Sequence, residues 1–182
     1  MIRPIALTCL LLLAACQEEP PPGPVVLTED AVGHFCQMNM IEHPGPKAQV
    51  HLDGLPGAPL FFSQVRDAVL FLRMPERDNR IVAIYVNDMG AAASWEDPGV
   101  ANWIDAHKAV YVTGSRRMGA MEAPEFVPFG SADQARAFAD EFGGKVMMLD
   151  EIPDELVMPV AGPDSDADYA GRLSALAGPK ED

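Results

Sequence analysis

The sequence predicts an α+β fold made of two small, pseudo-repeated ββαβ-type units that pack together. Three observations support this prediction. Short β-branched or aromatic runs are bounded by Gly, Pro and Asp, which is typical of strands. Two amphipathic stretches each begin after a serine, and the same order of segments recurs in both halves of the chain. One helix on one small antiparallel sheet buries little core alone, so the units are expected to pack on each other.

The first unit is expected over about residues 46–88. Its segments, in the order strand, strand, helix and strand, are AQVHLD (48–53), PLFF (59–62), SQVRDAVLFLRM (63–74) and RIVAIYV (80–86). Ser63 is the expected cap residue of the helix, and Pro75 follows the helix. The apolar face of this helix consists of Val65, Ala68, Val69 and Leu72.

The second unit is expected over about residues 106–152. Its segments, in the same order, are AVYVTG (109–114), FVPF (126–129), GSADQARAFADEFG (130–143) and KVMMLDEI (145–152). Ser131 precedes the helix, and Gly143 with Gly144 ends it. The connector 86–108 contains two tryptophans, and Trp103 is expected to pack beneath the second unit.

The N-terminus has the layout of a secretory signal over residues 1–15, with Arg3 ahead of a short apolar run and small residues before the cut. The run is shorter than the roughly 20 residues that span a bilayer. Its ending, Leu-Ala-Ala-Cys16, resembles a bacterial lipobox, in which the cysteine is acylated. Several acyl chains anchor a protein stably. The sequence therefore predicts a lipid-anchored body outside the cytoplasm, with either membrane as its support.

The segments at both ends of the expected domain, residues 29–161, differ from it in composition. Residues 16–28 form a Pro-rich linker. It is expected to be flexible relative to the domain, while its prolines favour an extended, semi-rigid polyproline II conformation. Residues 162–182 are rich in Asp, Ala, Gly and Pro, which predicts a disordered acidic tail. The net charge of −14 excludes nucleic acid as a partner, because phosphate binding needs a basic patch.

The three cysteines leave one free thiol in the exported protein. Cys9 departs with the signal and Cys16 carries lipid, so Cys36 has no partner for an intramolecular disulfide. A single cysteine left in an exported protein indicates a reactive thiol, an intermolecular bridge or a metal ligand.

Two methionine-containing segments accompany this thiol. Met38 and Met40 follow Cys36 at spacings of two, so the three sulfurs share one face in an extended strand and can converge in a loop. A thiolate with thioethers is a soft donor set that selects Cu(I). Met118 and Met121 lie in a Gly-containing loop between two expected strands, a suitable place for ligands of a transient ion. The alternative is that these sulfurs fill the core.

The segment CQMNM (36–40) resembles the C-x-M motif of the NosL family. WIDAHKAVYVTGS (103–115) and MEAPEFVPFGSADQARAFADEFGGKV (121–146) resemble two further stretches of that family in the same order. The resemblance implies a pair of ββαβ-type units and copper ligands at Cys36, Met38 and Met121, with Met118 as an alternative. Met40 stands where the family has an aliphatic residue, so it is an extra ligand or a core residue.

The resemblance further implies a periplasmic, membrane-anchored chaperone of Cu(I). Its cargo would supply the copper-sulfide centre of nitrous oxide reductase, and its partners would be that reductase and a membrane ABC-type assembly complex. A chaperone makes and breaks no bond of a substrate, so the protein is expected not to be an enzyme. A monomer or weak dimer is expected.

Other readings of the residues remain open. His34 and His43 flank the motif and are candidates for a fourth ligand or a weaker Zn(II) or Cu(II) site. A blue-copper electron-transfer protein would need two His with the Cys. A thiol enzyme would need a positioned base, and the sequence shows no nucleophile elbow. A non-metal periplasmic adaptor would bury Cys36.

Overall fold

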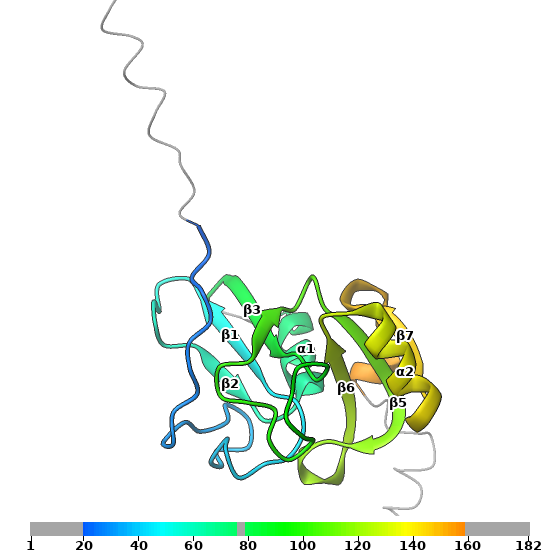
Figure 1. Ribbon diagram of the computed structural model, residues 1–182. Coiled ribbons are helices and arrows are strands. Elements are labelled where there is room, and N and C mark those ends of the chain that lie inside the picture. The colour runs from blue at the N-terminus through cyan, green and yellow to red at the C-terminus, as the bar shows by residue number, and fades with distance from the viewer. Residues whose placement is uncertain (1–19, 76–78, 159–182) are drawn as a thin grey trace, which may run out of the picture.

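The computed structural model describes residues 20–75 and 79–158, and within them two antiparallel sheets carry the fold (Figure 1). The first sheet has the strand order β2-β1-β3-β4 and the second has the order β6-β5-β7. Each sheet belongs to one ββαβ unit, so the predicted α+β class is confirmed. In the described part of the chain, no helix is long and apolar enough to cross a bilayer.

The first unit follows the predicted order and gains one strand. Its elements are β1 (Ala48–Leu52), β2 (Leu60–Phe62), α1 (Val65–Arg73), β3 (Ile81–Asn87) and β4 (Trp103–Asp105). The short strand β4 pairs with β3, with Val86 opposite Ile104. The expectation that Trp103 packs beneath the second unit is wrong, because its ring packs against a cluster of Leu27, Ala31 and Met40 beside the first sheet.

The second unit repeats this order with two short 3₁₀ helices, η1 and η2, added. Its elements are β5 (Val110–Met118), η1 (Ala120–Glu122), β6 (Pro124–Phe129), α2 (Ala132–Phe142), β7 (Lys145–Met148), η2 (Leu149–Glu151) and α3 (Asp154–Val157). Ser131 occupies the N-cap position of α2, although its side chain makes no capping bond. Gly143 ends α2 with φ of 76°, a conformation that glycine adopts without a steric penalty.

The main core lies between the two units, as expected from their small size. Helix α1 contributes Val65, Ala68 and Val69 to it, all nearly inaccessible to solvent. Residues of both sheets complete it, among them Val50, Ile84, Val86, Tyr111 and Phe126. The hydroxyl of Tyr111, which is fully buried, donates to the main-chain oxygen of Ala106 at 2.7 Å. The two units therefore stabilise each other through one shared core.

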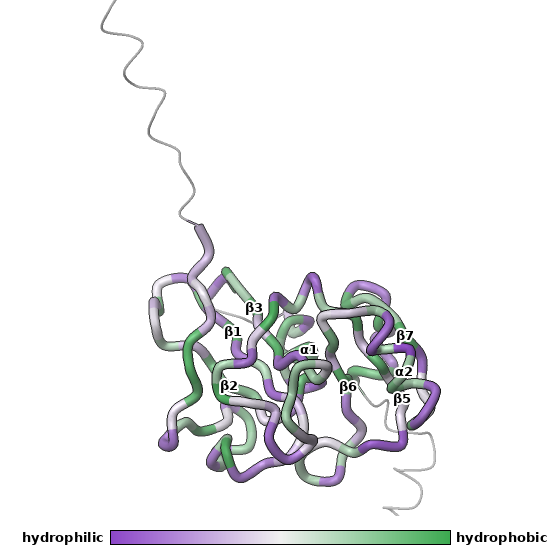
Figure 2. Tube along the Cα trace, viewed as in Figure 1, coloured by the Kyte–Doolittle hydropathy of each residue, from purple (hydrophilic) through white to green (hydrophobic). Residues whose placement is uncertain are grey.

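The outer faces of the two sheets are covered differently. Helix α2 covers the second sheet through an apolar cluster with Val112 and Val127. The first sheet alternates apolar and polar residues along β1 (Figure 2), and its outward residue Gln49 is fully buried beneath the linker. The Gln49 amide bonds both main-chain groups of Val25, at 2.8 and 3.0 Å. The described part of the expected flexible linker is therefore held on the sheet.

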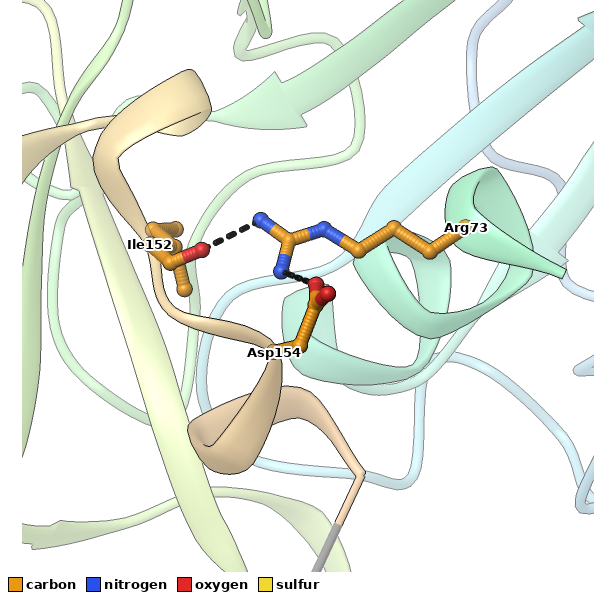
Figure 3. Close-up of polar contacts among 3 residues, drawn as sticks. All are labelled: Arg73, Ile152 and Asp154. Atoms are coloured by element: carbon orange, nitrogen blue, oxygen red, sulfur yellow. Dashed lines mark hydrogen bonds and ion pairs between the residues drawn. The ribbon is translucent and has the colours of Figure 1, made fainter.

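An arginine at the end of α1 connects the two units. Arg73 donates to the main-chain oxygen of Ile152 at 2.6 Å and to the carboxylate of Asp154 (Figure 3). Because the carbonyl groups of the last helical turn lack intrahelical partners, a cation in that turn also interacts favourably with the helix dipole. This contact helps to fix the direction of α1, whose other end carries the candidate site.

Candidate metal-binding site

The segment that contains Cys36 is a tight loop, called here the Cys36 loop (residues 32–40). An isolated β-bridge closes it, and the amide of Gly33 donates to the carbonyl of Met38 at 2.9 Å. Gln37 has a φ of 55°, so the backbone reverses between the first two sulfur residues. The extended-strand alternative is therefore wrong, and the loop alternative holds.

The three sulfur side chains of this loop differ in exposure. Cys36 is half-buried, Met38 is 47% exposed and Met40 is fully buried. The thiol accepts a long hydrogen bond from the hydroxyl of Ser63, with 3.5 Å between Oγ and Sγ. A Cβ atom on Gly33 would lie 2.4 Å from Sγ of Cys36 and 3.4 Å from Sδ of Met40. The glycine thus leaves space for both sulfur atoms.

An aromatic group supports the Cys36 loop from beneath. The amide of His34 donates to the carbonyl of Phe61 at 2.6 Å, which attaches the loop to β2. The rings of His34 and Phe35 lie within 5.2–6.3 Å, centroid to centroid, of the rings of Phe62 and Phe71. The loop therefore rests on a rigid apolar base, and the candidate ligand His34 lies within this ring group.

The second sulfur segment is the β5–β6 connection, called here the Met121 hairpin (residues 119–123). It is closed by a hydrogen bond of 2.9 Å from the amide of Gly119 to the carbonyl of Ala123. Met121 and Glu122 have φ values of 59° and 56°. The Met121 side chain is 66% exposed, and Met118 at the end of β5 is 48% exposed. Both thioethers are accessible to an ion from solution.

Among the described residues other than glycine, the positive φ values belong to Gln37, Met121 and Glu122. Such conformations cost of order 1 kcal/mol or more each and concentrate where a ligand or a switch requires them. The residues with positive φ therefore lie in the Cys36 loop and the Met121 hairpin, the two segments that contain the candidate sulfur ligands.

The N-terminal end of α1 brings the two segments into one region. On one side, Ser63 contacts the Cys36 thiol, and Gln64 is the next residue along the chain. On the other side, a Cβ atom on Gly119 would lie 3.0 Å from the side-chain nitrogen Nε2 of Gln64 and 2.7 Å from a carboxyl oxygen of Glu125. In Figure 1 the Cys36 loop and the Met121 hairpin both lie at the lower end of the view. Cys36 and the Met121 hairpin thus flank one helix end.

Glu125 is a residue of this region to which the sequence reasoning gave no role. Its side chain is 2% exposed. It accepts backbone N–H bonds from Val65 at 3.3 Å, Arg66 at 3.0 Å and Phe126 at 2.7 Å. Burial raises the pKa of Glu125 to about 8, although the three N–H donors act in the opposite direction. In the sequence, the only sign of this role is that an acidic residue directly precedes the apolar run FVPF (126–129).

The remaining predicted candidates occupy other surroundings. His43 is buried, and its Nε2 atom has no hydrogen-bond partner among the described atoms. Its main-chain oxygen accepts from the buried ammonium of Lys47 at 2.6 Å. Burial lowers the pKa of Lys47 to about 8. Cys16 lies outside the described residues. The described chain holds no group of three or more His, Cys, Asp or Glu side chains suited to a metal ion.

Comparisons with known proteins agree on one family. The family model described as NosL matches residues 24–157. The copper-binding lipoprotein NosL of Achromobacter cycloclastes is 53% identical over 178 residues, which cover 93% of this chain and 92% of the relative. The copper-binding lipoprotein NosL of Stutzerimonas stutzeri is 32% identical over 139 residues, which cover 76% and 70%. A crystal structure of the copper chaperone NosL from Shewanella denitrificans matches with a TM-score of 0.68 and 32% identity, covering 73% of this chain and 97% of that chain.

Proposed function

The chain belongs to the NosL family, and we propose on this basis that it is a copper chaperone that carries Cu(I) as cargo. Cys36 binds the ion as a thiolate, and the thioethers of Met38 and Met121 complete a partly exposed, three-coordinate site. Thiolate and thioether are soft ligands that favour Cu(I) over harder cations. Cu(I) is released by stepwise ligand exchange on a partner, and no bond of a substrate changes.

One observation carries this proposal. Two sulfur segments that are about eighty residues apart in sequence flank the same helix end, and both have strained backbones and exposed thioethers. Met40, in contrast, packs in the core and is fully buried. Met38 and Met121 remain in contact with solvent on loops that a rigid core positions, where a ligand can be both bound and passed on.

The test is a titration of the reduced, signal-free protein with Cu(I) against a competing chelator. Cys36→Ser, Met38→Ala and Met121→Ala should each lower the Cu(I) affinity by at least about tenfold, which corresponds to about 1.4 kcal/mol. Met158→Ala is the matched control, because Met158 is 48% exposed, close to the value for Met38, and lies beyond α3. Wild-type affinity in Cys36→Ser would contradict the proposal.

We propose further that the copper is delivered for the copper-sulfide centre of nitrous oxide reductase, with a membrane ABC-type assembly complex as the docking partner. Copper-loaded protein should transfer its ion to copper-free reductase in membranes that hold this complex, as measured by copper content after separation. Equal transfer from a free Cu(I)–chelator complex at the same free copper concentration would contradict a chaperone role.

The proposed location is the periplasm, with the protein anchored by lipid on Cys16. The relatives from Achromobacter cycloclastes and Stutzerimonas stutzeri are lipoproteins, and the lipobox-like ending of the signal supports the same modification here. Cys16→Ser should move the protein from the membrane fraction to the soluble periplasmic fraction. Retention of the variant in the membrane fraction would contradict lipid anchoring at this residue.

A further inference from the structure

We propose that Glu125 is a positioning residue that fixes the Met121 hairpin relative to Cys36. The proposal rests on the proposed function, because it takes Met121 as a copper ligand. Glu125 bears no sulfur and is buried, so it acts on the ion only through the segments that it holds. Its carboxyl group joins the end of α1 to the base of the hairpin.

The contact with α1 replaces an ordinary helix cap. The first N–H groups of a helix lack intrahelical partners and carry the positive end of the helix dipole. The N-cap residue of α1 is Gln64 rather than the expected Ser63, and it makes no side-chain capping bond. The N–H groups of Val65 and Arg66 instead donate to the carboxyl oxygens of Glu125, about sixty residues away. This contact fixes the position of β6 relative to the helix end that contacts Cys36 through Ser63.

The contact with the hairpin is a steric one. Gly119 begins the Met121 hairpin, and its α-carbon packs so closely on Glu125 that a Cβ atom would lie 2.7 Å from a carboxyl oxygen. Ala120 is fully buried at the same base. The base of the hairpin, Gly119 and Ala120, therefore packs against the Glu125 carboxyl group, and Met121 at its tip is exposed.

The surroundings of Glu125 leave it little freedom to move. A buried carboxyl is costly unless its oxygens are hydrogen-bonded, and the three backbone donors occupy both oxygens. Among the described residues, no basic side chain lies within ion-pair distance of it. The Glu125 side chain thus bonds only backbone groups of α1 and β6 among the described hydrogen bonds. These bonds fix the position of β6 relative to the start of α1.

The test is a double-mutant cycle on Cu(I) affinity, measured by chelator competition on the reduced, signal-free protein. Glu125→Gln keeps the shape of the side chain but removes one acceptor. Gly119→Ala adds a methyl group that displaces the carboxyl, at a backbone φ of −79° that alanine tolerates. Each should lower the Cu(I) affinity by about tenfold where Met121 is present, and by less than about twofold in Met121→Ala. Val112→Ala, which opens a cavity beneath α2, controls for general destabilisation and should leave the affinity unchanged.

The outcomes separate the two proposals. An equal loss from Glu125→Gln with and without Met121 would overturn the positioning role, and so would no loss in either background. If Met121→Ala alone leaves the affinity unchanged, Met121 is not a ligand, and this part of the proposed function fails together with the inference. Urea unfolding of each variant verifies that all titrations were made on folded protein.

Discussion

Met38 and Met40 show how two equivalent residues of a motif receive different environments. They lie two positions apart in the Cys36 loop, but Met38 is 47% exposed and Met40 is fully buried. The loop turns at Gln37, so the alternation of an extended strand does not apply. Met40 packs with Leu27 and Ala31, while its sulfur faces the glycine that also contacts Cys36.

The first prediction concerns this buried methionine. Met40→Leu conserves volume and polarity, so the free energy of unfolding should fall by less than about 1.5 kcal/mol. The Cu(I) affinity should fall by less than about tenfold, because Met40 acts by packing. Chelator competition together with urea unfolding measures both quantities. A loss of affinity as large as that of Cys36→Ser would show instead that Met40 is an inner ligand.

The sequence could identify the candidate sulfur ligands but not their arrangement in space. Cys36, Met38 and Met121 follow from residue type, compartment and the family resemblance. Glu125 gives no comparable signal, because a single acidic residue at the start of a predicted strand is normally expected to face solvent. Its burial depends on the N–H groups of α1 about sixty residues away. A long-range cap of this kind has no local pattern in sequence.

At the scale of elements, every predicted strand and helix is present, and the elements that the sequence did not predict are β4, η1, η2 and α3. Helices α1 and α2 and strands β1, β2, β3, β5, β6 and β7 appear where apolar runs or amphipathic faces predict them, although β7 ends at Met148 rather than continuing to Ile152. Strand β4 has three residues, too few for a period to be read. Strand β5 continues over polar residues to Met118, because pairing with β6 rather than composition extends it.

The second prediction concerns the buried cap of α1. Burial raises the pKa of Glu125 to about 8, so the folded protein binds this proton more tightly than the unfolded chain. The stability from protonation is fully present below the unfolded pKa and is lost as the pH rises through about 8. The free energy of unfolding of wild type, relative to Glu125→Gln, should therefore fall between about pH 5 and pH 8. Urea unfolding of both proteins across this range tests it, and a constant difference would contradict the stated pKa direction.

The third prediction concerns the linker. Gln49 holds Val25 through both groups of its amide and also contacts His51 at 2.9 Å. Gln49→Ala should lower the free energy of unfolding by about 1–3 kcal/mol, because buried polar groups lose their partners. It should also speed hydrogen exchange at the Val25 amide. Gln134→Ala removes an exposed glutamine bond elsewhere and should change neither quantity. Unchanged exchange at Val25 in Gln49→Ala would show that the linker is held by other contacts.

At the scale of the whole molecule, the shared core makes the two units interdependent. Residues from both sheets meet around α1, and Tyr111 is fully buried at their junction. Among the described residues, the second unit adds a smaller cluster of four buried residues beneath α2, so most of the buried apolar residues lie in the shared core. The pseudo-repeat is therefore a repeat of topology, and one cooperative domain is the thermodynamic unit.

The fourth prediction uses the two tryptophans as separate reporters. Trp95 packs on the second unit, beside Phe138 and 4.6 Å from the guanidinium of Arg117, and Trp103 lies on the first sheet. Trp95→Phe and Trp103→Phe each leave one reporter. In each variant, fluorescence and far-UV circular dichroism should give the same urea midpoint. Two separate midpoints within one variant would show that the units unfold independently.

The bound linker also determines by which end the protein is held. The blue segment with which the described chain begins enters the domain at its upper end in Figure 1, and the Cys36 loop and the Met121 hairpin lie at the lower end. Because Gln49 holds Val25, a handle placed ahead of residue 20 is attached at the end of the domain opposite the Cys36 loop and the Met121 hairpin in Figure 1. Capture on a sensor chip through the N-terminus therefore presents the Cys36 loop and the Met121 hairpin to the flowing solution, so the proposed binding and release of Cu(I) can be followed there away from the support.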